Sequence, residues 1–382
     1  MPHLRAVQDK PVRIVAGLMC GTSMDGLDMA ICRIDRDRPS CELLAFETVP
    51  LPDELMASLR GDETGSLAAV AHWHRAIGEA YAQALAGFVR REGIALDLIG
   101  SHGQTVYHAH GEASLQLGDP CFLADALDCP VVSQFRQGDI ALGGAGAPLV
   151  PYVDYRLVGR ADRATMILNI GGIANFTVLP RRPCPPEAVM GFDCGPGNMI
   201  IDHIARRYTE GRQGADLDGR FASRGSVRRD VFDHLREHRF FGQRPPRSAG
   251  REQFGPAFAD ALIEAVAPVT DQDWLDLFAT ATELTAFAVY DAYRRFVAPS
   301  ISVEEILLCG GGAHNGELAR RIGRYFSNLP VAPTDSVGWP ADAKEAMAFA
   351  FLASERVDER PANMPSVTGA RRAVLLGSIT AC

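Results

Sequence analysis

The sequence predicts a two-lobed α/β protein, and three observations lead to this prediction. The chain has 382 residues, which is long for one compact domain and enough to bury a substantial core. Two similar segments, each a strand, a glycine turn and a second strand, have turns that lie 150 residues apart, at Gly21 and Gly171. After each of them helix-like and strand-like segments alternate, which is typical of mixed sheets flanked by helices.

Each of the two glycine hairpins is predicted to begin one lobe. The first has a strand at 13–19, a polar turn at 20–26 and a strand at 27–35. The second has a strand at 164–170, a glycine turn at 171–174 and a strand at 175–179. We interpret their likeness as a similarity of pattern, which alone does not establish an internal repeat.

Hydrophobic periodicity predicts the elements that follow. Apolar side chains recur every three or four residues across 66–92, and Gly93 follows as a favourable helix end. Residues 143–148 (GGAGAP) separate the two halves, either as a hinge or as a close approach to a ligand. Further helices are predicted at 122–128, 198–208, 275–296, 315–326 and 341–356, and further strands at 96–100, 130–134 and 304–309.

Composition narrows the class of partner. A formal net charge of −9 disfavours nucleic acid and anionic membranes as partners. Nine cysteines without a CxxC pair or zinc spacing indicate reduced, mostly buried thiols. The apolar run at 14–20 is short for a signal peptide and lacks a cleavage pattern, and no stretch approaches the ~20 apolar residues of a membrane span. We therefore expect a cytoplasmic protein that acts on a small molecule.

Three glycine turns after strands are the sharpest chemical signal. Backbone N–H groups in such turns can hold phosphates, and Asp25 could reach Mg²⁺ through water. A single glycine pair is more often structural, and neither a Walker A lysine pattern nor a dinucleotide fingerprint is present. Together the turns favour a two-lobed clamp on ATP, with candidate ATP-binding residues Gly21, Thr22, Ser23, Met24, Asp25, Gly26, Leu27, Asp28, Gly171, Gly172, Gly310, Gly311, Gly312 and Asn315.

Asp193 is the candidate catalytic residue. It lies in GFDCGPGN (191–198), at the end of an apolar stretch and ahead of a rigid Gly-Pro-Gly turn. A carboxylate at such a place suits a general base, although an aspartate that merely stabilises a turn is the commoner case. We favour the base because the turn fixes the backbone and offers no core packing.

Other polar residues are candidates for substrate contacts. The segment 100–108 (GSHGQTVYH) follows a strand, and its two histidines have no third metal ligand nearby, so hydrogen bonds to substrate or structural roles are favoured. Arg136 could bind a carboxylate or form a surface ion pair. Glu345 lies on an otherwise apolar helix and would need a partner such as a substrate hydroxyl. The basic, proline-rich segment 243–252 is predicted to be a solvated surface loop.

Taken together, these segments resemble the anhydro-N-acetylmuramic acid kinases, a family of the actin-like, hexokinase and Hsp70 ATPase superfamily. The matching stretches run in order over nearly the whole chain, with small departures at Cys20, Cys194 and 181–188. They are GLMCGTSMDGLD (17–28), GSHGQTVYH (100–108), FRQGDIALGGAGAPLVP (135–151), LNIGGIANFT (168–177), GFDCGPGN (191–198), LLCGGGAHN (307–315), DAKEAMAFAFLA (342–353) and PSVTGA (365–370).

The resemblance implies a two-lobed actin-like, ribonuclease H-like fold with an interlobe cleft. Lobe I would comprise 1–142 and 357–382, and lobe II 143–356. It also implies an ATP- and Mg²⁺-dependent reaction that opens a 1,6-anhydro sugar with water and phosphorylates O6, in cell-wall recycling. Asp193 would activate the water, and the sugar would contact Gln104, Thr105, Arg136 and Glu345. A homodimer is a further expectation from the family.

Two alternatives remain open at this point. One is a kinase for a free hexose or amino sugar, which would share the lobes and ATP turns and differ only in its sugar-facing residues. The other is a non-catalytic ATP-regulated module, which is disfavoured because the chain has no appended peptide-binding domain and Asp193 accompanies a polar substrate set.

Overall fold

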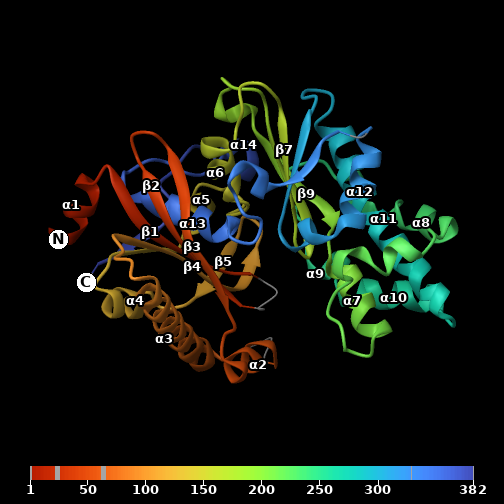
Figure 1. The fold of residues 1–382 in the computed structure, drawn as a ribbon, viewed down its shortest axis with the longest axis horizontal. Helices are drawn as coiled ribbons and strands as arrows, with labels where there is room; N and C mark the ends of the chain where they lie inside the picture. Colours follow the sequence, from red (N-terminus) through yellow and green to blue (C-terminus); the bar gives the residue numbers. More distant parts are fainter. Residues whose placement is uncertain (1, 22–25, 62–65, 328, 382) are drawn as a thin grey trace. The chain divides into compact units, whose positions relative to one another are not determined.

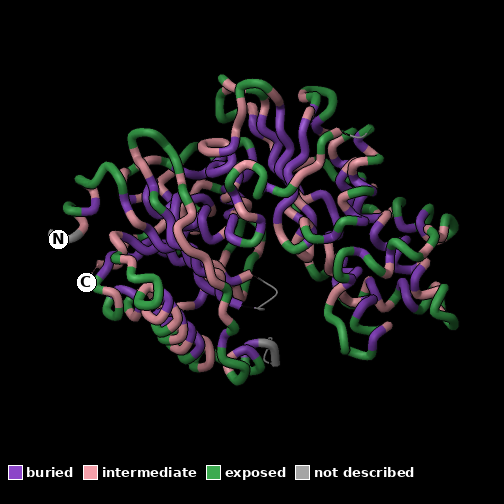
Figure 2. Tube along the Cα trace, in the orientation of Figure 1, coloured by how far each residue is buried: buried purple, intermediate pink, exposed green. Residues whose placement is uncertain are grey.

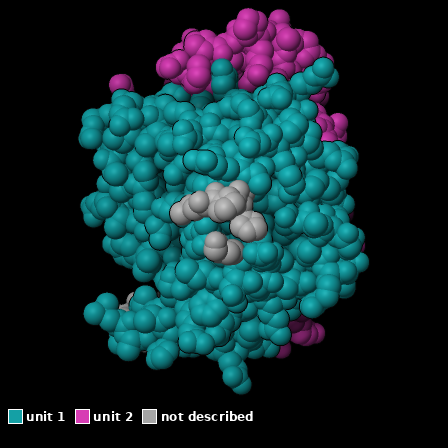
Figure 3. Space-filling model, turned by 90° about the vertical axis from the view of Figure 1, so that its left-hand side faces the viewer, with its two compact units in different colours: residues 1–158, 343–382 teal, residues 159–342 magenta. Residues whose placement is uncertain are grey.

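The computed structural model describes residues 2–21, 26–61, 66–327 and 329–381. The chain forms two compact units, the first of residues 1–158 with 343–382 and the second of residues 159–342 (Figure 3). Each unit contains one mixed β-sheet with helices packed on it (Figure 1).

The sheet of unit 1 has the strand order β12-β6-β4-β1-β2-β3, with β5 paired to β4. β1, β2 and β3 form an antiparallel meander, whereas β4 pairs in parallel with β1, and β6 in parallel with β4. The strands are β1 (Val12–Cys20), β2 (Leu27–Asp35), β3 (Ser40–Val49), β4 (Leu98–Ala109), β5 (Ala113–Leu117), β6 (Val131–Ser133) and β12 (Ser378–Thr380).

The sheet of unit 2 has the order β11-β10-β7-β8-β9 and repeats the same pattern. Again three antiparallel strands come first, the fourth pairs in parallel with the first, and the fifth with the fourth. The strands are β7 (Thr165–Ile170), β8 (Ile173–Leu179), β9 (Met190–Pro196), β10 (Glu305–Cys309) and β11 (Val331–Pro333). The antiparallel strand pairs of both predicted hairpins are confirmed, as is the predicted α/β fold with mixed sheets.

The helices of unit 1 are α1 (Pro2–Asp9), α2 (Asp53–Gly61), α3 (Leu67–Glu92), α4 (Pro120–Leu127), α5 (Gln137–Ala141), α6 (Val150–Leu157), α13 (Lys344–Val357) and α14 (Pro365–Thr368). Those of unit 2 are α7 (Met199–Tyr208), α8 (Arg229–Leu235), α9 (Arg251–Phe254), α10 (Pro256–Val266), α11 (Asp271–Phe296) and α12 (Gly316–Tyr325). No helix within the described residues is both long and apolar enough to cross a bilayer.

Helix α3 covers one face of the unit 1 sheet. Its Ser66 cap accepts a hydrogen bond from Ala69 N at 3.2 Å, and Gly93 ends the helix in the left-handed region at φ 66°. The predicted apolar stripe, including Ile77 and Tyr81, packs against alternate residues of the strands such as Leu18. The strand interiors are accordingly buried (Figure 2).

Helix α13 covers the opposite face of the same sheet. Successive strand residues point to opposite faces, so Gly17 faces away from the side on which Leu18 packs. A Cβ at Gly17 would collide with the carbonyl oxygen of Ala346, and one at Gly100 with that of Phe349. Glycine is therefore needed at both positions because the helix backbone lies directly on the strands.

Unit 2 has two adjoining cores. The sheet packs against α11 and α12 through residues such as Phe176 and Val289, and a helical subcore joins α7, α10 and the first half of α11. Helix α11 begins four residues before the predicted 275, because Thr270 and Asp273 form a capping box.

The boundaries of the units differ from the predicted lobes. The predicted lobe II includes residues 143–158 and 343–356, whereas these residues belong to unit 1. The reason is that α6 and α13 are tied to each other and to the first sheet. The Lys344–Asp154 ion pair at 2.7 Å is almost fully buried, and Arg156 Nη1 donates to Glu355 Oε2 at 2.6 Å.

Candidate active site

In unit 1 the predicted phosphate turn begins next to Gln104. Strand β4 pairs in parallel with β1 so that Cys20 lies opposite Gln104, and Gln104 Nε2 donates to the carbonyl oxygen of Gly21 at 3.2 Å. The Gln104 side chain is fully buried, and its Oε1 has no hydrogen-bond partner among the described residues. A buried amide oxygen without a donor is costly, so this position suits a ligand that donates.

The far end of that turn is anchored on β3. A Cβ on Gly26 would lie 2.9 Å from Thr48 Cγ2, and the Asp28 carboxylate accepts a hydrogen bond from Thr48 Oγ1 at 2.6 Å. Leu27 is a core residue, so only its backbone could face a nucleotide. The candidates Thr22, Ser23, Met24 and Asp25 lie outside the described residues.

Arg136 and His102 form a polar pair in the same unit. Arg136 donates from Nε and Nη2 to His102 Nε2 at 3.1 and 2.9 Å, and from Nη1 to the Gly146 carbonyl oxygen at 2.8 Å. Because a guanidinium can only donate, His102 Nε2 must be the acceptor, and its Nδ1–H donates to the Gly103 carbonyl oxygen at 2.9 Å. Burial, and then the Arg136 charge, lower the pKa of His102 well below its usual value. His102 is therefore neutral.

Glu345 lies close enough to Arg136 for their charges to interact. Burial lowers the pKa of Arg136 to about 10, and the negative charge of Glu345 opposes that shift. Glu345 is in the first turn of α13 and is half-buried. Thr105 is the neighbour of Gln104 on β4, and its Oγ1 accepts a hydrogen bond from Gln116 Nε2 of β5 at 3.2 Å. Among the predicted site residues of unit 1, Arg136 thus interacts with the charge of Glu345, and Gln104 is hydrogen-bonded to Gly21.

In unit 2 the glycine turn of the second hairpin is braced by the backbone after β9. Gly197 N and Met199 N donate to the Gly172 carbonyl oxygen at 2.9 and 3.1 Å, and Asn198 N donates to that of Gly171 at 2.8 Å. The turn that follows Asp193 in sequence therefore holds Gly171 and Gly172 in place.

The third glycine turn packs on the end of β7. Gly310 has φ 72°, and a Cβ there would collide with Asn169 Oδ1 and lie 3.0 Å from the Ile170 carbonyl oxygen. A Cβ at Gly312 would collide with the Ile170 side chain. Gly311 is different, because its Cβ would meet only Asn198 Nδ2 at 3.7 Å. Both predicted glycine turns of unit 2 thus lie at the same end of the sheet.

A cavity of about 70 Å³ in unit 2 is lined both by residues of the turns just described and by three aspartates. Asn198, Gly311 and Asn315 line it. Asn315 also has a structural role, because its Oδ1 accepts the hydrogen bond of Leu318 N at 2.9 Å and caps α12. The lining residues that sequence analysis did not single out are Ile201, Asp202, Asp216, Leu217, Asp218 and His314.

The carboxylates of this cavity are electrostatically coupled. Burial, and to a lesser extent the charge of Asp216, raise the pKa of Asp202 to about 6, against the lowering effect of Arg206. Burial also raises the pKa of Asp216, whose oxygens accept hydrogen bonds from Phe221 N and Ala222 N at 2.8 and 3.0 Å. The only sequence signal for Asp202 is its place four residues after Asn198, one helical turn along α7.

Asp193 lies on β9, the edge strand of the unit 2 sheet, opposite Asn175 of β8. Its Oδ2 accepts hydrogen bonds from Ser248 Oγ at 3.1 Å and from Ala249 N at 2.8 Å. The Asp193 carboxylate is thus hydrogen-bonded to a segment that is distant from it in the sequence.

The prediction of a solvated loop at 243–252 is wrong for Arg247. Arg247 is only 7% exposed, and its guanidinium lies over the rings of Phe192, Phe240 and Phe296 at 5.4, 4.7 and 5.1 Å from their centroids. The sequence shows only charge and prolines here. The aromatic rings that bury the arginine come partly from 192 and 296, which are distant in sequence.

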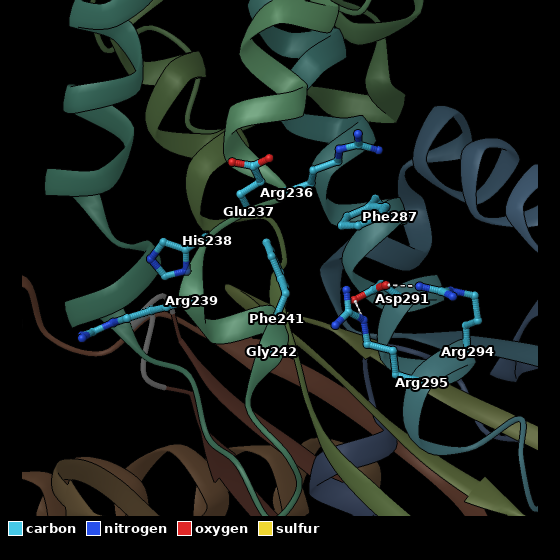
Figure 4. A pocket seen from close by; sticks show the side chains of 10 residues that line it. All are labelled: Arg236, Glu237, His238, Arg239, Phe241, Gly242, Phe287, Asp291, Arg294 and Arg295. Carbon is cyan, nitrogen blue, oxygen red and sulfur yellow. Dashed lines mark hydrogen bonds and ion pairs between the residues drawn. The ribbon is translucent and has the colours of Figure 1, made fainter.

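A second cavity, of about 520 Å³, lies in unit 2 between residues 236–242, which follow α8, and the second half of α11 (Figure 4). Phe241 and Phe287 are among its lining residues. Asp291, only 2% exposed, is paired with Arg294 Nη2 at 3.0 Å and Arg295 Nε at 2.6 Å. None of the predicted site residues lines this cavity.

Within the described residues, no group of three or more histidine, cysteine or acidic side chains could hold a metal ion.

Comparison with known proteins identifies relatives over the full length. The family model described as anhydro-N-acetylmuramic acid kinase matches residues 13–382. A curated relative of that name from Salinibacter ruber is 41% identical over 397 residues, which cover 100% of this chain and 99% of the relative. Another, from Caldanaerobacter subterraneus subsp. tengcongensis, is 38% identical and covers 100% of both chains.

Solved structures give a weaker likeness. The activator of the 2-hydroxyisocaproyl-CoA dehydratase from Clostridium difficile, with bound ADPNP, has a TM-score of 0.44 and 12% identity, and covers 91% of this chain and 96% of that chain. A ROK family glucokinase from Streptomyces griseus has a TM-score of 0.38 and 14% identity, and covers 90% and 99%. Neither adds to the assignment of function.

Proposed function

This chain belongs to the anhydro-N-acetylmuramic acid kinase family, and from that premise we propose how its residues divide the work. It is an ATP-dependent kinase for anhydro-N-acetylmuramic acid in peptidoglycan recycling. The substrate poses a particular problem, because its O6 is bonded to C1 and no free 6-hydroxyl exists to attack ATP. The enzyme must open this bridge as it transfers the phosphoryl group.

In the proposed reaction a water molecule attacks C1 and gives one proton to Asp193. The C1–O6 bond breaks, O6 bonds to the γ-phosphorus of ATP, and the bond to the β–γ bridging oxygen breaks. The products are N-acetylmuramic acid 6-phosphate and ADP. Asp193 is suited to the role of base because a positioned carboxylate near the attacking water can take its proton.

The observation that carries this proposal is the bracing between the segment after Asp193 and the glycine turn of β7–β8. The backbone of residues 197–199 donates three hydrogen bonds to the carbonyl oxygens of Gly171 and Gly172. A phosphate gripped by that turn would therefore lie at a fixed place relative to β9. Catalysis of phosphoryl transfer depends mainly on such positioning.

We propose that ATP is held by two sets of residues. In unit 2, Gly171 and Gly172 bind phosphate, and Gly310, Gly311, Gly312 and Asn315 bind the nucleoside, with Asp202 and Asp218 near the ribose. In unit 1 the turn from Gly21 to Asp28 binds the terminal phosphates. Mg²⁺ would arrive with ATP and offset the negative charge of the phosphates, with Asp25 or Asp28 as its protein contact.

The sugar is assigned to unit 1. Arg136 would bind the carboxylate of the sugar's lactyl group, because it is a half-buried cation whose hydrogen bonds go to the neutral His102 and the Gly146 carbonyl oxygen, with Glu345 as its nearby negative charge. Glu345 would accept a hydrogen bond from a sugar hydroxyl, and Gln104 Oε1 one from the N-acetyl N–H or a hydroxyl. Thr105 is the fourth residue that we propose to contact the sugar.

The proposal includes a cytoplasmic location, since the reaction consumes ATP, and a homodimer, which the family resemblance alone supports. Light scattering of the purified protein at micromolar concentration measures the second point directly. A mass of one chain under all conditions would remove the homodimer from the proposal.

Asp193→Asn tests the assignment of the base. The amide cannot take a proton, so kcat falls by about 10²- to 10⁴-fold. Binding of a non-hydrolysable ATP analogue, measured by calorimetry, stays within about 2-fold of wild type, because the nucleotide contacts are elsewhere. Asp230→Asn, an exposed aspartate on α8, is the matched control with normal turnover. Wild-type turnover by Asp193→Asn would refute the assignment.

A substrate comparison tests the sugar specificity. Wild-type enzyme with ATP and Mg²⁺ phosphorylates anhydro-N-acetylmuramic acid in preference to N-acetylglucosamine, which lacks both the anhydro bridge and the lactyl carboxylate. Preferential phosphorylation of the free amino sugar would contradict the assignment of Arg136.

A further inference from the structure

We propose that Arg247, Ser248 and Ala249 are positioning residues that orient the carboxylate of Asp193. This inference rests on the proposed role of Asp193 as the base. Nothing in the sequence pattern points to these three residues, which lie 54 to 56 positions further along the chain. We call them the clamp.

The first observation is that two donors converge on one oxygen atom. Ser248 Oγ and Ala249 N both donate to Asp193 Oδ2, at 3.1 and 2.8 Å. Two donors on one carboxylate oxygen fix the rotation of the carboxylate about its terminal torsion, which is otherwise broad.

The second observation is that the clamp is hydrogen-bonded to the backbone of the strand that carries Asp193. β9 is the edge of its sheet, and an edge strand presents backbone groups that no further strand satisfies. Arg247 supplies hydrogen-bond donors to this edge. Its Nε donates to the Asp193 carbonyl oxygen at 2.8 Å, and its Nη2 donates to the Cys194 carbonyl oxygen at 3.3 Å. One side chain therefore fixes the strand and the loop relative to each other.

The third observation is the burial of the Arg247 charge. Within the described residues Arg247 forms no ion pair, and its remaining hydrogen bonds also go to carbonyl oxygens, those of Phe240, Phe241 and Gln243. Burial lowers the pKa of Arg247, although nearby Cys194, Asp193 and Asp291 raise it. A buried guanidinium is expensive, and here its carbonyl bonds and aromatic contacts hold the loop in one conformation.

The charges around Asp193 allow a pH measurement to be interpreted. Arg247 faces it from the loop and Cys194 follows it on β9, while Asp291 and Arg295 of α11 face Arg247. Burial raises the pKa of the Cys194 thiol well above its usual value, so it stays neutral below pH 8. The arginines stay charged throughout, so the acidic limb of the kcat profile reports on carboxylates, Asp193 foremost.

Ser248→Ala is the test, because Ser248 is exposed and its replacement leaves the core intact. Loss of a donor to a charged group lowers kcat about 10-fold, while KM for ATP changes less than about 2-fold. Hydrogen bonds to a carboxylate favour its charged form, so their loss moves the acidic limb of kcat to higher pH, by about half a unit to one unit. Ser248→Thr keeps the hydroxyl and restores both quantities.

The outcomes separate the two proposals. If Asp193→Asn is inactive while Ser248→Ala has the wild-type kcat and acidic limb, the clamp proposal is wrong and the base assignment stands. A lower kcat in Ser248→Ala with an unmoved acidic limb also overturns the clamp, because it indicates a merely structural role. If Asp193→Asn remains active, the base assignment itself fails. Thermal unfolding of each variant, measured alongside, confirms that each is folded.

Discussion

The two units share one strand order but carry different chemistry. Both sheets begin with an antiparallel meander whose first strand pairs in parallel with the fourth. Around the first sheet lie a cation and a neutral imidazole, Arg136 and His102. Around the second lie carboxylates, those of Asp193, Asp202 and Asp216. The comparison teaches that the two sheets supply strands at equivalent places, whereas the side chains on those strands and on the segments packed against them decide what each place can bind.

Two glycines, one on the first strand of unit 1 and one just after the first strand of unit 2, differ in how closely they are packed, and replacement by alanine measures this difference. Gly17→Ala would place a methyl group against the backbone of α13, so it lowers the free energy of unfolding by about 2 to 3 kcal/mol. Gly171→Ala is the matched change in unit 2. Its Cβ meets its nearest atom, the Ile173 carbonyl oxygen, at 3.8 Å, so the loss stays below about 1 kcal/mol.

Urea unfolding followed by circular dichroism gives both values. Equal destabilisation by the two changes would mean that the helix on the first sheet can move aside, which contradicts the close contact of α13 with β1.

The separate tasks of the units predict separate kinetic defects. Arg136→Gln removes the cation of unit 1 and raises KM for the anhydro sugar about 10- to 100-fold with little change for ATP. Gly311→Ala adds a methyl group that the protein itself can accommodate, since the nearest atom is 3.7 Å away, but that occupies the lining of the nucleoside cavity. It raises KM for ATP about 5-fold and leaves that for the sugar unchanged.

Steady-state kinetics with one substrate varied at a time resolve the two defects. If both variants raised KM for the same substrate, the division of tasks between the units would be wrong.

Sequence patterns predict those elements whose signal is local. The apolar stripe of α3 and the paired strands of the two glycine hairpins are each readable within about 25 residues. The segments that depend on distant partners are misplaced. Helix α13 belongs to unit 1 because Lys344 pairs with Asp154, and Arg247 is buried because rings from residues 192 and 296 enclose it. Pairings across such separations leave no periodic signal in the chain.

The candidate site shows the same limit. The glycines of unit 2 are predictable because a run of glycines directly after a strand indicates a tight turn or a close backbone approach, and Gly310 and Gly312 are sterically required there. Asp202, Asp216 and Asp218 escape prediction because each is an ordinary surface residue in sequence terms, and only the fold gathers them on one cavity.

Asp202 gives a predicted effect on stability that depends on pH, and its sign follows from the shifted pKa. Burial raises the pKa of Asp202 from 3.8 to about 6 in the folded state, so the folded protein disfavours the charged carboxylate. This penalty is fully present above pH 6 and disappears as the pH falls toward 4. Asp202→Asn is neutral at every pH. It therefore increases the free energy of unfolding at pH 8, by about 1 to 3 kcal/mol, and by nearly nothing at pH 4.

Thermal or urea unfolding at the two pH values measures the difference. A stabilisation of the same size at both would show that removal of charge is not its cause.

The central claim is that water activated by Asp193 attacks C1 as O6 takes the phosphoryl group. The most direct measurement is mass spectrometry of the sugar phosphate formed in ¹⁸O-labelled water and quenched early. A sample of unlabelled product kept in the same water corrects for spontaneous anomeric exchange. The account predicts one ¹⁸O atom at C1 and none in the phosphate group. Product without label at C1 beyond the exchange control would contradict it.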